Sequence, residues 1–208
     1  MASTEFTKRL LTYRLSLLHL KKMGLKDVYS HLISEETGFS AALIRKDFSR
    51  IAIQGKRRGG YTIDGILDTI DNYFGDKNIN EVVLVGMGNI GKAIARYKDF
   101  EKQNICIFAA FDIDPVKQRK KFSIPVYSMD KCPGIISERK IDTGIIAVPA
   151  LSAQSVCDQL IQYGIKGILN FAPVNLKVPG HIFVSNLSIC DELRRVIYHA
   201  RENPYESK

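Results

Sequence analysis

Residues 81–95 carry the feature that restricts the fold most: an apolar run that passes directly into three glycines with the spacing G-x-G-x-x-G. The pattern predicts a strand, a tight turn and a helix. Gly86 permits the turn, Gly88 lets a ligand approach the backbone, and Gly91 lets the helix lie close to the strand. Because the N–H groups that open a helix favour negative charge, the segment predicts a site for the pyrophosphate of a dinucleotide. The alternative is a glycine-rich turn without a ligand.

A second apolar run favours the ligand. Residues 105–111 predict a strand that ends at Asp112, 21 residues beyond Gly91. A carboxylate in this place accepts hydrogen bonds from the hydroxyls of an adenine ribose. An acid there also repels a 2′-phosphate, which favours NAD over NADP. Asp114 is instead suited to cap the next helix, since Pro115 follows at the favoured first helical position.

The strand pattern continues along the chain. Residues 124–127, 143–149, 167–171 and 182–184 predict four further strands, and residues 152–163 predict a helix. Strands separated by helical segments predict an α/β fold, a doubly wound parallel Rossmann sheet. Ligands gather at the carboxyl ends of such strands, so two proline-containing turns are expected to edge the pocket, unless the prolines only end their strands. The expected dinucleotide contacts are Gly86, Met87, Gly88, Asn89, Ile90, Gly91, Asp112, Ile113, Val148, Pro149, Ala150, Asn170, Phe171, Ala172 and Pro173.

The segment before this sheet has helical periodicity. Helices are expected over residues 5–23, 25–36 and 41–51, and the last two are joined by a short turn containing Gly38. This arrangement is typical of a helix-turn-helix. Two β-type stretches over residues 51–63, joined by glycines and arginines, predict a wing. A helix over residues 63–74 then closes a small winged-helix domain.

The net charge of +8 is concentrated in this domain, because residues 45–58 contain six basic side chains and one acidic side chain. A basic run is usually only a solvated face, but its place on a helix-turn-helix and wing favours binding to nucleic acid. The helix is expected to enter the major groove and the wing tip to contact phosphates. The expected DNA contacts are Ser40, Arg45, Lys46, Ser49, Arg50, Lys56, Arg57, Arg58 and Tyr61.

These patterns divide the chain into a winged-helix domain over residues 1–78, a Rossmann domain over residues 79–187, and a C-terminal helix and tail over residues 188–208. The last helix opens at Ser188 and has an apolar face that needs a partner, for which a second subunit is a natural candidate. Four scattered cysteines indicate neither a zinc site nor a disulfide framework. No apolar run is long enough for a membrane span or a signal peptide, so a cytoplasmic protein is expected.

The chain resembles the Rex family of redox-sensing transcriptional repressors over nearly all of residues 8–198. The resemblance is carried by residues 44–49 (IRKDFS), the wing, residues 85–91 (VGMGNIG), residues 111–115 (FDIDP) and residues 164–174 (GIKGILNFAPV). It implies a homodimer that binds operator DNA when NAD⁺ is plentiful and releases it when NADH accumulates. It also implies that the C-terminal helix is exchanged between subunits, that Phe171 lies near the nicotinamide, and that Tyr97 belongs to the cofactor site.

The sequence departs from the family at several positions. Family members usually have Tyr-Phe-Gly after the recognition-helix serine, whereas this chain has Arg50-Ile51-Ala52. A tyrosine, an arginine and an aspartate couple the cofactor site to the winged domain in family members. Tyr97 keeps the first, but Leu15 and Ser188 occupy the other two positions.

Two other functions are compatible with parts of the pattern. Tyr127 and Lys131 have the Tyr-x-x-x-Lys spacing of short-chain dehydrogenases, which use it for proton transfer. The pair lies too early in the Rossmann sequence for that family, and no substrate domain follows. The second alternative is a DNA-binding dimer of the same fold that responds to a different nucleotide or to none.

Overall fold

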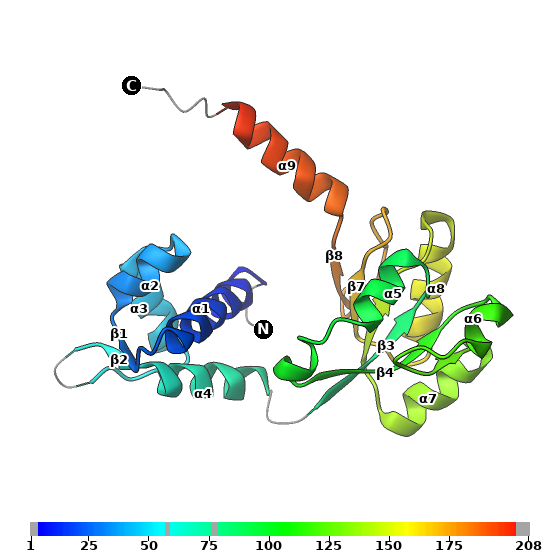
Figure 1. Ribbon diagram of the computed structural model, residues 1–208, viewed down its shortest axis with the longest axis horizontal. Helices are drawn as coiled ribbons and strands as arrows, with labels where there is room; N and C mark the ends of the chain where they lie inside the picture. The colour runs from blue at the N-terminus through cyan, green and yellow to red at the C-terminus, as the bar shows by residue number, and fades with distance from the viewer. Residues whose placement is uncertain (1–3, 57–58, 76–78, 203–208) are drawn as a thin grey trace. The chain divides into compact units, whose positions relative to one another are not determined.

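The computed structural model describes residues 4–56, 59–75 and 79–202, which divide at residue 78 into two units. In the N-terminal unit, the first helix buries one side chain every three or four residues, from Phe6 to Leu20, as an amphipathic helix requires. Ser40 caps the third helix, because its hydroxyl accepts a hydrogen bond from the Leu43 N–H at 3.3 Å. The elements are α1 (Thr4–Lys22), β1 (Asp27–Val28), α2 (Ser30–Thr37), α3 (Ala41–Arg50), β2 (Tyr61–Thr62) and α4 (Ile63–Phe74) (Figure 1).

Two secondary-structure predictions for this unit were wrong. Residues 25–36 do not form one helix, because Asp27 and Val28 form β1 and α2 begins only at Ser30. Residues 51–54 form no strand either, and β2 pairs instead with β1 in antiparallel fashion, with Val28 opposite Tyr61. Pairing between segments more than 30 residues apart therefore overrides the local helical periodicity.

The wing begins with a strained residue. Ala52 has φ = 58°, in the left-handed region that favours glycine. Because alanine adopts this conformation with strain, the turn is more costly to form than it would be with glycine.

The C-terminal unit has a six-stranded sheet in the order β5-β4-β3-β6-β7-β8, with every adjacent pair parallel. This is a doubly wound sheet, and the strand order reverses between β3 and β6. The elements are β3 (Asn80–Val85), α5 (Asn89–Ala95), β4 (Ile105–Phe111), α6 (Pro115–Arg119), β5 (Val126–Tyr127), α7 (Cys132–Arg139), β6 (Thr143–Ile146), α8 (Ala150–Gln162), β7 (Gly167–Asn170), β8 (Phe183–Asn186) and α9 (Ile189–Glu202).

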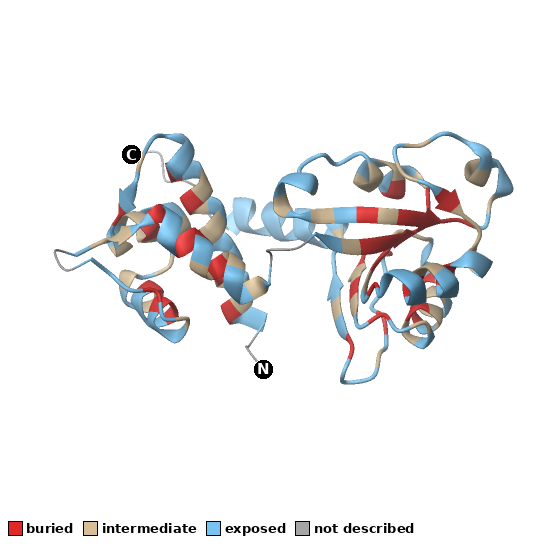
Figure 2. Cartoon of the chain, turned by 90° about the horizontal axis from the view of Figure 1, so that it is seen from below, coloured by how far each residue is buried: buried red, intermediate tan, exposed pale blue. Residues whose placement is uncertain are grey.

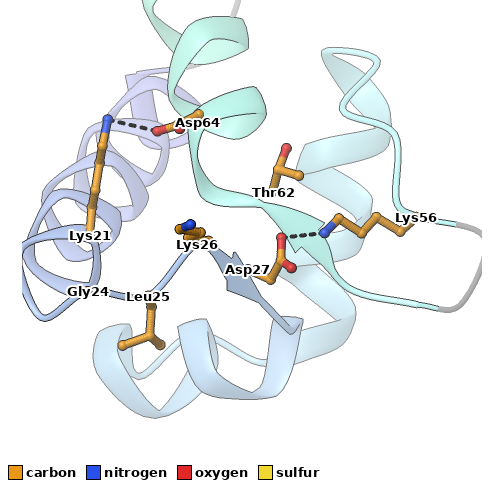
Figure 3. A pocket seen from close by; sticks show the side chains of 8 residues that line it. All are labelled: Lys21, Gly24, Leu25, Lys26, Asp27, Lys56, Thr62 and Asp64. Atoms are coloured by element: carbon orange, nitrogen blue, oxygen red, sulfur yellow. Dashed lines mark hydrogen bonds and ion pairs between the residues drawn. The ribbon is translucent and has the colours of Figure 1, made fainter.

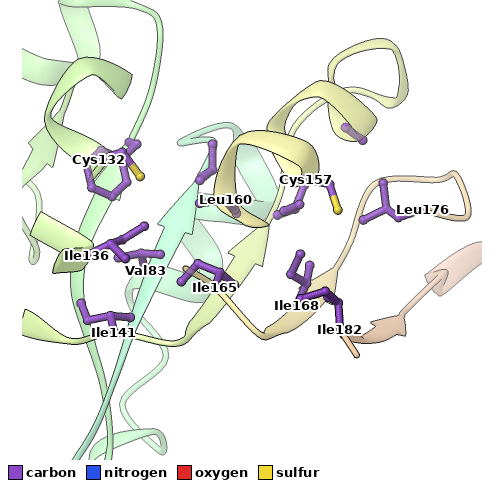
Figure 4. Close-up of a cluster of buried hydrophobic side chains, with 14 of the residues drawn as sticks. Val83, Cys132, Ile136, Ile141, Cys157, Leu160, Ile165, Ile168, Leu176 and Ile182 are labelled. Atoms are coloured by element: carbon purple, nitrogen blue, oxygen red, sulfur yellow. The ribbon is translucent and has the colours of Figure 1, made fainter. Parts of the chain in front are cut away.

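Both faces of this sheet are covered, and successive residues of β3 serve different faces. Val83 and Val85 pack into one core with α7 and α8 (Figure 4), whereas Val82 and Leu84 pack into a second core with α5. The central strands are therefore buried on both sides, as Figure 2 shows. Burial on two faces explains why these strands are continuous apolar runs.

Two helices of this unit have features that need an explanation. Pro133 lies in the first turn of α7, where its missing N–H has no helical partner to lose. Helix α9 has no buried residue. Among the described residues, no helix combines the length and the hydrophobicity needed to cross a lipid bilayer.

Candidate functional site

The glycine-rich turn lies between β3 and α5, at the reversal of strand order. Gly86 has φ = +100°, and a Cβ there would lie 2.7 Å from the Ala147 carbonyl carbon. A Cβ on Gly91 would collide with the Gly86 carbonyl oxygen. A Cβ on Gly88 would meet no atom within 4 Å. The fold therefore requires Gly86 and Gly91, whereas Gly88 leaves open space at the start of α5.

Asp112 fixes this turn from the end of β4. Its side chain is 6% exposed, and Oδ2 accepts a hydrogen bond from the Met87 N–H at 2.7 Å while Oδ1 accepts one from the Asp114 N–H at 2.9 Å. Lys117 Nζ donates to the same Oδ2 at 2.9 Å. Burial alone would raise the pKa of Asp112, but these donors outweigh it and hold the pKa below its usual value.

Lys117 changes the argument about a 2′-phosphate. The sequence predicted that the acid at position 112 repels a 2′-phosphate, whereas the structure pairs Asp112 with an ammonium group from α6, which weakens that repulsion. Of the two carboxylate oxygens, Oδ1 keeps the greater capacity to accept a ribose hydroxyl. Asp114 caps α6 as expected, because Oδ1 accepts from the Val116 N–H at 2.9 Å.

A cleft of about 280 Å³ opens beside this turn. It contains six of the predicted dinucleotide contacts, namely Gly86, Gly88, Asp112, Ile113, Val148 and Pro149. The sequence did not predict Lys117, Ser152 and Val156, which also line it. Ser152 and Val156 lie one helical turn apart on α8. The sequence prediction considered only residues at the carboxyl ends of strands, such as Val148, and therefore did not include residues of the following helix.

The other predicted cofactor residues lie outside this cleft. Asn170 is fully buried, and its Nδ2 donates to the Val174 carbonyl oxygen at 2.7 Å and to Asn186 Oδ1 at 2.9 Å, so it shapes the turn after β7. Phe171 is half-buried against the core that contains Met87. Tyr97 follows the C-terminal end of α5 and packs edge-on against Phe100. The cleft lining also lacks Met87, Asn89, Ile90, Gly91, Ala150, Ala172 and Pro173.

The third helix of the N-terminal unit presents a basic outer face. Arg45, Lys46 and Ser49 are exposed. Arg45 NH1 donates to the Ser30 hydroxyl at 2.9 Å, which links α3 to the start of α2, and the Ser49 hydroxyl donates to the Arg45 carbonyl oxygen. Lys46 pairs with no other residue that the structure describes. It is therefore the cation of this helix that is most available to a ligand.

Arg50 has a different environment. Its guanidinium lies 4.2 Å from the centre of the Phe6 ring in α1, a cation–π contact. The Arg50 guanidinium is thus engaged with the first helix of its own unit. Arg50 remains exposed, but binding DNA through it would compete with this contact.

Asp47, the one acidic residue of the basic segment, is the internal anchor of α3. It is 3% exposed, and Oδ2 accepts hydrogen bonds from Arg9 Nε at 2.6 Å and from the Tyr13 hydroxyl at 2.9 Å. Burial favours the protonated acid, but these two donors outweigh it and keep the pKa of Asp47 low. Burial raises the pKa of Tyr13, as does its hydrogen bond to Asp47. The sequence prediction assigned Asp47 no role.

The wing cations and Tyr61 separate into different roles. Lys56 Nζ lies 2.5 Å from Asp27 Oδ1, beside a hollow of about 570 Å³ at the base of the wing (Figure 3). Tyr61 packs edge-on against the buried Phe48, with ring centres 5.1 Å apart, so it is a core residue as well as a wing residue. Arg57 and Arg58 lie outside the described residues.

The four thiols do not resemble a redox centre. Burial raises the pKa of Cys132 to about 12 and that of Cys157 to about 11, so neither forms a reactive thiolate at neutral pH. Cys106 and Cys190 are exposed and free.

Comparisons with known proteins agree with these two sites. Residues 76–174 match the family described as "CoA binding domain", and residues 3–49 match the family described as "Putative DNA-binding protein N-terminus". The chain is 38% identical over 192 residues to the redox-sensing transcriptional repressor Rex of Oenococcus oeni, covering 89% of this chain and 86% of that protein. It is 35% identical over 202 residues to Rex of Listeria welshimeri, covering 97% and 94%.

Solved structures extend the comparison to bound states. The crystal structure of RSP, a Rex-family repressor, is 32% identical and has a TM-score of 0.88, covering 97% of this chain and 96% of RSP. RSP with β-NADH gives a TM-score of 0.86, with 97% and 95% covered. RSP with β-NAD⁺ and operator DNA gives 0.89, with 97% and 94% covered.

Proposed function

The chain belongs to the Rex family of redox-sensing transcriptional repressors, and from that premise we propose that it binds operator DNA as a homodimer and leaves the DNA when NADH binds its Rossmann unit. Members of the family are repressors, not enzymes. The Tyr127 and Lys131 pair also lacks dehydrogenase geometry, because Tyr127 lies on β5 and Lys131 Nζ lies 5.3 Å from the centre of its ring.

The observation that carries this proposal is that one chain holds both halves of such a switch. A glycine turn with open space at Gly88 adjoins a cleft at the point where strand order reverses. A separate unit presents the exposed cations of α3. We assign the cleft to NADH and NAD⁺ and the α3 face with the wing to DNA, with the domain limits at residues 78 and 187.

The homodimer rests on α9. Its exposed apolar side chains recur at helical spacing and form one face: Ile189, Leu193, Val196 and Ile197. An apolar face of this length on an otherwise polar helix is stabilised only when something covers it. A second copy of the chain is the occupant that also supplies two recognition helices, as a palindromic operator requires.

Release by NADH follows from linkage. If NADH binds the dimer better when the two α3 helices do not match the spacing of the half-sites, it shifts the population toward that form. DNA must then weaken NADH binding by the same factor. The size of this coupling depends here on Leu15 and Ser188, which replace the charged pair of the family.

The first prediction tests the proposal directly. The DNA is a palindromic duplex chosen from a random pool by its binding to the protein. The dissociation constant for this operator is expected to rise at least about fivefold as NADH replaces NAD⁺, which corresponds to the low end of usual coupling energies. Lys46→Ala is the matched variant, because it should weaken operator binding and leave NADH affinity unchanged. Operator binding without any response to NADH would leave the alternative of a different nucleotide ligand, which a titration with ATP would examine.

The second prediction concerns α9. In the proposed dimer, Leu193→Asp replaces an apolar side chain whose burial is worth about 2 kcal/mol by a charged one, so the dimer dissociation constant should rise at least about 30-fold. Sedimentation measures this constant, and operator affinity should fall with it. Arg195→Asp introduces the same side chain on the opposite side of α9 and should leave the dimer intact. A monomeric wild-type protein would contradict the proposed assembly.

A further inference from the structure

The wing has little backbone pairing to hold it in place. The ladder between β1 and β2 has only two residue pairs, Asp27 with Thr62 and Val28 with Tyr61. Its turn is closed by hydrogen bonds from the Lys56 N–H to the Gly60 carbonyl oxygen at 2.8 Å and from the Gly59 N–H to the Lys56 carbonyl oxygen at 2.9 Å. A ladder this short is marginal in water.

An aromatic ring lies directly under the two glycines of the wing. A Cβ added to Gly60 would lie 3.1 Å from Tyr29 Cε1, and one added to Gly59 would lie 3.7 Å from the same atom. Both glycines have positive φ, +87° at Gly59 and +75° at Gly60. The wing backbone therefore passes close to the Cδ1 and Cε1 atoms of Tyr29, and a side chain at either position would disturb this arrangement.

Tyr29 is in turn fixed to the helix-turn-helix. Its ring stacks on His31, with ring centres 5.5 Å apart and an angle of 22° between the planes. Between them in sequence, Ser30 accepts the hydrogen bond from Arg45 of α3. One continuous set of contacts thus runs from α3 through the start of α2 to the wing. Tyr29 is nonetheless 51% exposed, so its ring is not a core residue.

We propose that Tyr29, supported by His31, is the positioning residue of the wing. It holds Gly59 and Gly60, and through the Gly60 carbonyl oxygen also Lys56, in a fixed place relative to the α3 face, so that Lys56 and α3 bind DNA at once. This inference rests on the proposed function and adds that the contact between the wing and DNA depends on Tyr29 and His31. Without the ring, the wing no longer holds its cation against the DNA backbone, so a phosphate contact is lost and affinity falls.

Tyr29→Ala and Tyr29→Phe separate this role from a general structural one. For Tyr29→Ala, affinity for the selected duplex should fall about tenfold, and the slope of log affinity against log salt should become shallower by about one, since each lost phosphate contact removes about 0.9. Tyr29→Phe keeps the ring and should behave as wild type. Thermal unfolding should be the same for all three proteins, because the side chain is half exposed.

Limited trypsin digestion tests the same proposal without DNA. Cleavage after Lys56, Arg57 and Arg58 should be several times faster in Tyr29→Ala than in wild type or Tyr29→Phe. Equal cleavage rates, or weaker DNA binding with an unchanged salt slope, would overturn the proposal. If the wild-type protein bound no duplex at all, the proposed function would fail, and the digestion result would still decide whether Tyr29 anchors the wing.

Discussion

Gly88→Val is expected to weaken NADH binding at least about 100-fold, or roughly 2.7 kcal/mol, while the Rossmann unit keeps its stability to within about 1 kcal/mol. Gly88 has φ = −74° and ψ = −162°, an extended conformation that valine adopts, and a Cβ there meets no atom within 4 Å. The substitution therefore costs the fold little. It fills the space through which a pyrophosphate would approach the N–H groups of α5.

Calorimetric titration with NADH and thermal unfolding measure the two effects separately. Gly180→Val is the matched control, because Gly180 also has open space around it and lies outside the cleft. Gly91→Ala should give the opposite result to Gly88→Val, with loss of stability, because its Cβ would collide with the Gly86 carbonyl oxygen. Operator binding should persist in Gly88→Val and stop responding to NADH. NADH affinity equal to wild type would refute the assigned site.

Asp47→Asn is expected to lower the free energy of unfolding of the N-terminal unit by about 3 kcal/mol, the effect of leaving one member of a buried ion pair without its partner. The amide keeps the shape of the side chain but removes the charge that Arg9 faces at 2.6 Å. Because the pair joins α1 to α3, operator affinity should also fall. Urea unfolding followed by circular dichroism measures the loss of stability.

The exposed pair of Lys21 and Asp64 provides the control. Its atoms lie 2.7 Å apart, but the two side chains are 54% and 72% exposed, so Asp64→Asn should change the free energy of unfolding by less than about 1 kcal/mol. If the two substitutions lowered the free energy of unfolding equally, burial would not strengthen the contribution of the Asp47 pair to stability.

The Asp47 pair also predicts a pH dependence. The folded-state pKa of Asp47 is lowered, so its stabilising contribution is fully present above the unfolded pKa of about 4. It is lost as the pH falls through the folded pKa. The stability difference between wild type and Asp47→Asn should therefore be constant from about pH 5 to pH 8 and shrink below about pH 4. A difference that persisted undiminished in acid would exclude the ion pair as its cause.

The local sequence pattern predicted secondary structure correctly where a single regular backbone geometry explains the pattern. Residues 105–111 form β4 and residues 63–74 form α4 with the predicted bounds, because strands and helices repeat their apolar positions with fixed periods. The glycine spacing likewise indicated a tight turn, and the structure has the close backbone approaches at Gly86 and Gly91 that such a turn requires. These features depend on residues near one another in sequence.

The wrong predictions all involve partners that are distant in sequence. Residues 25–36 follow a helical pattern, yet Asp27 and Val28 pair with residues beyond the wing. The sequence predicted that the two β-type stretches within residues 51–63 form the wing together. Residues 51–54 form no strand, and β2 pairs with β1 instead. The period of a segment indicates which face it can bury, and it carries no information on which other segment will cover that face.

The sequence alone determined the class of fold, the glycine-rich turn and the basic helix, because each depends on patterns within single strands, helices and turns and on the order of these elements along the chain. Only the tertiary structure decided the partners of the charged and aromatic side chains. Arg9 lies 38 residues from Asp47 and a tyrosine ring lies under glycines 30 residues further on. Chain folding brings such pairs together, and burial then makes the choice of partner energetically decisive.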